Sequence, residues 1–81
     1  MMNNMRNGEK LILIDQAIGA GATSWKWLPE TEVLVAYYEG DAENIPVETH
    51  YWVGIDDYGD EAVFGHDYWR DGQVTTGTFQ C

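Results

Sequence analysis

The segment Thr49–Asp56 has the sequence THYWVGID, and its alternation decides the fold class. Tyr51, Val53 and Ile55 fall on one side of an extended chain, and the residues between them fall on the other. A period of two is typical of a β-strand that is buried on one face only. We therefore predict a half-buried strand over this segment.

Toward the C-terminus, two further strands follow the first one after tight turns. Asp57-Tyr58-Gly59 is a turn sequence, and Glu61–Trp69 then alternates again. Asp71-Gly72 is a strong signal for a tight hairpin, and the Thr-rich stretch Gln73–Gln80 that follows it is prone to form a strand. Three strands joined by short turns predict an antiparallel meander.

Toward the N-terminus, Glu32–Glu39 (EVLVAYYE) is rich in β-branched and aromatic residues, which favours a strand over a helix of the same spacing. Ser24–Leu28 (SWKWL) predicts a short strand that ends at Pro29. The apolar run Lys10–Ile14 (KLILI) predicts a buried strand, and the glycine-rich Gln16–Thr23 predicts a loop that can include one helical turn.

These elements predict a mainly β fold in a single small domain. We expect an antiparallel meander of about five or six strands that forms a curved sheet or a small barrel, with little helix. Residues 1–9 are expected to be a flexible N-terminus, and residues 10–81 to form the acidic, β-rich domain.

The charge balance is the most unusual property of the chain. Fourteen Asp and Glu residues oppose four Lys and Arg residues, for a formal net charge of −10. Residues 30–71 hold twelve of the acids and one base, Arg70, which is a net charge of −11. Such a surface disfavours direct binding to nucleic acid or to an anionic membrane and favours a basic partner. The simpler interpretation is that the charge serves solubility.

Patterns that carry chemistry are weak in this chain. Gly19-Ala20-Gly21 lacks the other residues of a phosphate-binding loop, so a turn is the favoured interpretation. His50 and His66 could meet across neighbouring strands, but a pair of histidines is not a metal site. The single serine, Ser24, and the terminal Cys81 show no nucleophile pattern. We therefore expect no enzymatic activity, no cofactor and no metal.

The carboxylates around Gly59 do not have the spacing of a calcium loop, and a hairpin tip explains them better. Adjacent aromatic residues such as Tyr51-Trp52 point to opposite faces of a strand, so one of each pair should lie outside the main core. Exposed aromatic residues beside carboxylates suit a protein-binding surface. The predicted contact set combines acids with two aromatic anchors: Glu39, Asp41, Glu43, Trp52, Asp56, Asp57, Tyr58, Asp60, Glu61, Asp67 and Asp71.

In size, acidity and lack of enzymatic motifs, the whole chain resembles the small acidic proteins that phages encode against bacterial defence, including anti-CRISPR proteins and other DNA mimics. Trp27-Leu28-Pro29 followed by Val33–Tyr38 is also similar to a short pattern in small phage-borne domains of unknown function. The first resemblance implies an inhibitor that occupies the basic nucleic-acid channel of a defence complex.

The alternative is a structural or homo-oligomeric interaction domain that buries its aromatic face against a second copy. The chain has one cysteine, so no internal disulfide can form, and it has no signal-peptide pattern and no run of about 20 apolar residues. We expect a protein of the bacterial host cytoplasm that does not bind membranes.

Overall fold

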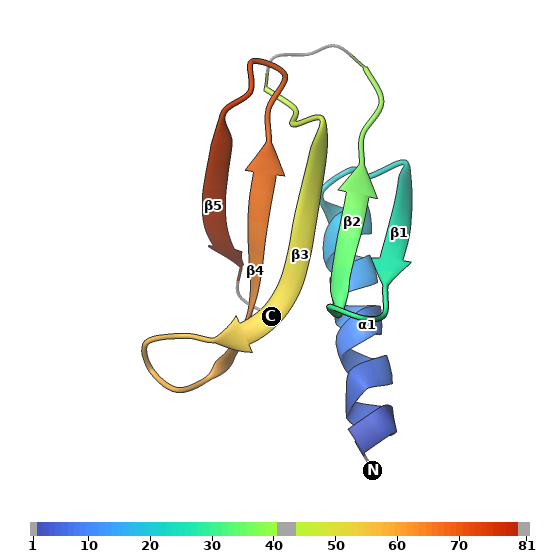
Figure 1. The fold of residues 1–81 in the computed structure, drawn as a ribbon, viewed down its shortest axis with the longest axis vertical. Helices are drawn as coiled ribbons and strands as arrows, with labels where there is room; N and C mark the ends of the chain where they lie inside the picture. Colours follow the sequence, from blue (N-terminus) through green and yellow to red (C-terminus); the bar gives the residue numbers. More distant parts are fainter. Residues whose placement is uncertain (1, 41–43, 80–81) are drawn as a thin grey trace.

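The computed structural model describes residues 2–40 and 44–79, with residues 2–9 described by their backbone alone. In chain order the elements are α1 (Met2–Gly19), β1 (Ser24–Leu28), β2 (Val33–Tyr37), β3 (Glu48–Ile55), β4 (Glu61–Tyr68) and β5 (Val74–Phe79). The strands form one antiparallel sheet in the order β1-β2-β3-β4-β5 (Figure 1). The prediction of a mainly β meander in a curved sheet is confirmed, and the sheet is open rather than closed into a barrel.

The strand predicted over Lys10–Ile14 is wrong, because this run lies inside α1. Leu13 and Ala17, four residues apart, face the sheet and are almost completely buried, which is helical spacing. Leu11 and Ile12 are exposed on the outer side of the helix. Because these outward residues are apolar too, the helical pattern appears in the sequence as one continuous apolar run. An apolar run of four residues is compatible with either a helix or a strand.

The glycine-rich segment Gln16–Thr23 divides at Gly19: residues 16–19 are the last turn of α1, and residues 20–23 form the predicted loop. Gly21 has a φ of +96°, and its N–H donates to the carbonyl of Ile18 over 3.0 Å. The Ala22 N–H donates to the carbonyl of Ala17 over 3.0 Å, which completes a Schellman motif. At the other end the helix begins at Met2, so the segment predicted to be flexible has a helical backbone from that residue on.

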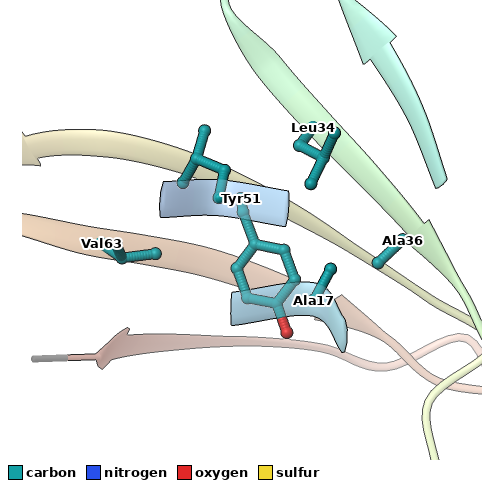
Figure 2. Packing of buried hydrophobic residues seen from close by; sticks show 6 residues of the cluster. Ala17, Leu34, Ala36, Tyr51 and Val63 are labelled. Atoms are coloured by element: carbon teal, nitrogen blue, oxygen red, sulfur yellow. The ribbon is translucent and has the colours of Figure 1, made fainter. Parts of the chain in front are cut away.

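α1 packs on β1, β2 and β3 and leaves β4 and β5 largely without helical cover (Figure 1). We call the side of the sheet that faces α1 the covered face and the opposite side the open face. Six side chains from the helix and three strands form the core on the covered face, with the Tyr51 ring at their centre (Figure 2). They are Leu13, Ala17, Leu34, Ala36, Tyr51 and Val63.

β3 and β4 are longer than their neighbours, and this difference in length creates a projection. β2 pairs with β3 only over residues 48–51, and β5 pairs with β4 only over residues 63–68. β3 and β4 stay paired with each other as far as Ile55 and Glu61. Residues 54–62 therefore form a two-stranded ribbon, the hairpin arm, whose turn extends away from the other strands in Figure 1.

Candidate protein-interaction surface

The tip of the hairpin arm is an acidic turn whose conformation follows from its sequence. The Gly59 N–H donates to the carbonyl of Asp56 over 3.1 Å, and the Asp56 N–H donates to the carbonyl of Asp60 over 2.8 Å. Gly59 has a φ of +84°. These bonds define a type I turn closed by a bulge that needs glycine in the left-handed region. The turn predicted at Asp57-Tyr58-Gly59 is confirmed.

Asp56 holds this turn with its side chain as well. Its Oδ1 accepts hydrogen bonds from the backbone N–H groups of Tyr58 and Asp60, both over 2.9 Å. The turn between β4 and β5 repeats the backbone arrangement, with Gly72 at a φ of +93° and Trp69 in the place of Asp56. There a different residue, Asp71, accepts a hydrogen bond at Oδ1 from the N–H of Gln73. Asp56 and Asp71 therefore both stabilise turns, and for Asp56 this agrees with the hairpin-tip interpretation of the carboxylates around Gly59.

The predicted contact set divides between the two ends of the strands. Asp56, Asp57, Tyr58, Asp60 and Glu61 gather at the tip of the arm, and the Tyr58 side chain is 90% exposed there. Glu30 and Glu32, in the turn between β1 and β2, lie at the same end of the meander.

The remaining members of the set lie elsewhere. Glu39 and Asp71 are exposed at the opposite end of the sheet, beside the connections from β2 to β3 and from β4 to β5. Arg70 is at that end too, and its Nη2 donates to the carbonyl of Gly40 over 3.0 Å. Asp41 and Glu43 lie outside the described residues. The arm tip is therefore the densest group of acids in the described part of the chain.

Asp67 lies on the covered face, where it ends a chain of hydrogen bonds. Thr49 is completely buried, and its hydroxyl donates to Asp67 Oδ1 over 2.7 Å. The Tyr38 hydroxyl donates to Thr49 Oγ1 over 3.1 Å. Because each hydroxyl has one proton, the 3.2 Å contact between Tyr51 and Tyr38 must have Tyr51 as its donor. The carboxylate thus orients three hydroxyl groups, and Asp67 is not presented with the acids of the arm.

Burial of the Tyr51 ring raises the pKa of its hydroxyl well above the usual value, and the hydrogen bond with Tyr38 adds to the effect. Among the described residues, no buried side-chain nitrogen or oxygen is left without a hydrogen-bond partner. The network therefore stabilises the fold as a chain of three hydroxyl groups whose hydrogen bonds end at one carboxylate.

A row of rings covers the middle of the open face. The Trp52 ring stacks on Phe64 with centroids 6.0 Å apart and lies 4.8 Å from His66. Tyr68 continues the row, with centroids 6.5 Å from His66 and 4.5 Å from His50. These five side chains, the ring row, are half-buried, and two of them come from β3 and three from β4. The prediction that one member of the Tyr51-Trp52 pair lies outside the main core is confirmed, because Tyr51 is in the core and Trp52 is on the open face.

The register places His50 directly opposite His66. His50 Nε2 contacts Glu48 Oε2 over 2.5 Å, and His66 Nδ1 is 2.9 Å from Thr76 Oγ1. Within residues 2–40 and 44–79, no group of three or more His, Cys, Asp or Glu side chains could hold a metal ion. Cys81 lies outside the described residues.

The turn predicted over Gly19-Ala20-Gly21 is confirmed at Gly21, and Gly19 is the last residue of α1. They lie at the C-terminal end of α1, where carbonyl groups carry the partial negative charge of the helix dipole. An anion favours the opposite end of a helix, where N–H groups are free.

Sequence reasoning missed two features, the ring row and the buried hydroxyl network. The alternation of His50, Trp52 and the residues of β4 could have indicated the ring row once the register was known. The network had no such signal, because its members come from three different segments.

No protein-family model, curated protein or solved structure matches this chain. In the part of the chain that the structure describes, no helix has the length and apolar character needed to cross a membrane.

Proposed function

We propose that this protein is a non-enzymatic inhibitor that inserts its acidic hairpin arm into a basic groove built to hold nucleic acid. The proposed target is a nucleic-acid-guided complex of bacterial defence, the class of partner implied by the resemblance to small acidic anti-defence proteins. The observation that carries this proposal is the shape and charge of the arm, which projects beyond its neighbouring strands and ends in four carboxylates.

Charge on the arm suits the first step of binding. The side chains of Asp57, Asp60 and Glu61 are exposed, and the arm carries no Lys or Arg. Negative charge that projects from the molecule raises the rate of encounter with a basic groove, and the effect weakens as salt increases. A groove that neutralises phosphates offers matching positive charge.

Apolar groups on the arm suit the second step. Tyr58 is 90% exposed and Ile55 is 63% exposed, both beside the carboxylates. An exposed aromatic side chain that becomes buried on binding is typical of the few residues that dominate the affinity of an interface. In this proposal the carboxylates set the association rate and Tyr58 sets the dissociation rate.

The test compares two variants with the same change in net charge. Asp57→Asn with Asp60→Asn removes two charges from the arm tip. Asp15→Asn with Glu39→Gln removes two exposed charges away from the arm; Glu39 belongs to the predicted contact set but lies at the opposite end of the sheet, so this control tests whether the arm alone makes the contact. Binding to purified guide-loaded CRISPR effectors, and displacement of DNA from them, is measured between low and physiological salt. We expect the arm variant to lose about tenfold in association rate and the control to lose less than about threefold.

Tyr58→Ala separates the apolar contribution from the charge. Its expected effect is a faster dissociation rate with little change in association rate. The proposal fails if the parent protein binds none of the effectors at low salt, or if the arm variant and the control lose affinity equally.

A further inference from the structure

The two edges of the sheet differ in how well they are protected from pairing with another strand. The edge strand β1 carries the exposed Lys26 and is followed by Pro29, and both residues discourage strand addition. The edge strand β5 has the sequence VTTGTF, with no charged residue and no proline. Among the described residues, no element pairs with the outer edge of β5.

The hydrogen-bond ladder identifies which groups of β5 are free to pair. The Trp69 N–H donates to the carbonyl of Gln73 over 2.9 Å, so these two opposite residues form a hydrogen-bonded pair at the start of the ladder between β4 and β5. Antiparallel pairs alternate between bonded and non-bonded positions, so Thr75, Gly77 and Phe79 bond to β4. The backbone N–H and C=O groups of residues 74, 76 and 78 therefore point away from the sheet.

The negative charge near the outer edge of β5 favours a basic strand as the segment that pairs with it. β5 itself is neutral, and its Phe79 end lies opposite Val63, two residues from Glu61 and the acidic arm. A strand added beside β5 would lie about 10 Å from β4, near the range over which charges act at physiological salt. A second copy of this chain would bring its own excess of acids to this edge, whereas basic residues would be attracted to it.

We propose that β5 binds an extended, basic segment of the partner protein by strand addition. The added strand runs antiparallel to β5, with alternating Val- or Thr-like residues along the edge and Lys or Arg at its N-terminal end, beside the arm. Backbone hydrogen bonds to residues 74, 76 and 78 supply the pairing, and the arm supplies the selection for charge. This inference rests on the proposed function, because it names how the basic partner is held.

The experiment uses a short synthetic peptide with lysines at its N-terminal end followed by alternating Val and Thr. Amide hydrogen exchange of the full chain is measured with and without the peptide. We expect new protection at residues 74, 76 and 78, with little change at residues 75 and 77, which already bond to β4. A peptide with glutamates in place of the lysines should bind at least about tenfold more weakly.

A matched pair of variants tests whether backbone groups carry the binding. Thr76→Pro removes the outward N–H, at a position where an edge strand tolerates proline. Thr76→Val removes the same hydroxyl, including its contact with His66, but keeps the N–H. We expect Thr76→Pro to lower peptide affinity at least about tenfold relative to Thr76→Val. If Thr76→Pro fails to fold, N-methylation of alternate peptide residues blocks the same bonds from the other side.

Three results would overturn the inference. The first is equal binding of the lysine and glutamate peptides. The second is protection of β5 that rises with protein concentration in the absence of peptide. The third is equal peptide affinity of the Thr76→Pro and Thr76→Val variants. The same experiments distinguish failure of this inference from failure of the proposed function. If arm variants weaken effector binding while β5 amides stay unprotected, only strand addition fails. If the peptide protects β5 while arm variants bind effectors normally, only the arm proposal fails.

Discussion

The two faces of one sheet reach stability by different means. On the covered face, α1 packs on the strands, and the polar groups of the buried side chains Tyr51 and Thr49 need hydrogen-bond partners inside the protein. On the open face no described helix lies over the strands, and the ring row shields itself by ring-to-ring contact. A small domain with a single helix can therefore close one side of its sheet and leave the other available for contact.

The largest expected effect is the difference in lost stability between a truncated core side chain and a truncated side chain on the open face. Leu34 is fully buried on the covered face, and Val74 is 53% exposed at the start of β5. Leu34→Ala should lower the free energy of unfolding by about 2–5 kcal/mol, because it leaves a cavity among the core residues. Val74→Ala should change it by less than about 0.5 kcal/mol. Urea denaturation of both variants measures the difference, and equal losses would contradict the assignment of the faces.

Two glycines provide a finer comparison of the faces. A methyl carbon added at Gly65 would lie 3.1 Å from the Phe79 ring and 3.2 Å from the buried Tyr51 ring on the covered face. One added at Gly54 would lie 2.7 Å from the Phe64 ring, which can swing outward on the open face. We expect Gly65→Ala to cost about 1–3 kcal/mol of stability despite the wider spacing, because the Tyr51 ring cannot move.

Gly54→Ala should cost less than Gly65→Ala and should instead alter the environment of Trp52, which stacks on Phe64. Thermal denaturation compares the two costs, and tryptophan fluorescence follows the open face. A larger loss from Gly54→Ala would mean that the ring row is packed as rigidly as the core.

The smallest expected effect concerns the hydroxyl of Tyr51 and depends on pH. At neutral pH, Tyr51→Phe should cost about 0.5–1.5 kcal/mol, the value of one hydrogen bond. The pKa of this hydroxyl is raised in the folded state, so above pH of about 10 the unfolded chain loses the proton while the folded protein keeps it. This contribution to stability is complete below about pH 10 and is lost as pH rises above it.

Alkaline stability measurements therefore test the network. The free energy of unfolding of the parent should fall with pH more steeply than that of Tyr51→Phe, by up to about 1.4 kcal/mol per pH unit. Tyr58→Phe is the matched control, because it removes an exposed hydroxyl at the arm tip and should leave the slope unchanged. Parallel slopes for the parent and Tyr51→Phe would contradict the burial of the Tyr51 hydroxyl.

Most of the sheet could be predicted from local sequence, and the N-terminal part could not. The alternation in β3 and β4 and the glycines of their turns act within a few residues, so β3, β4 and the turns around Gly59 and Gly72 were predicted correctly. α1 was missed because Leu11 and Ile12 are apolar yet exposed, which hides the helical period.

The candidate surface shows the same division. The acids at the arm tip were predicted as a group because they are neighbours in sequence. Asp67 was placed with them on charge alone, whereas the structure directs it to the covered face and the hydroxyl of Thr49.

By itself, the sequence of this protein determined its strands, its glycine-closed turns and its excess of negative charge, because backbone preference and side-chain alternation operate over a few adjacent residues. Only the tertiary structure decided which face the helix covers, that residues 54–62 project as an arm, and that β5 is left as an unprotected edge. Those features depend on the relative lengths and pairing of segments far apart in the chain, and no local pattern encodes them.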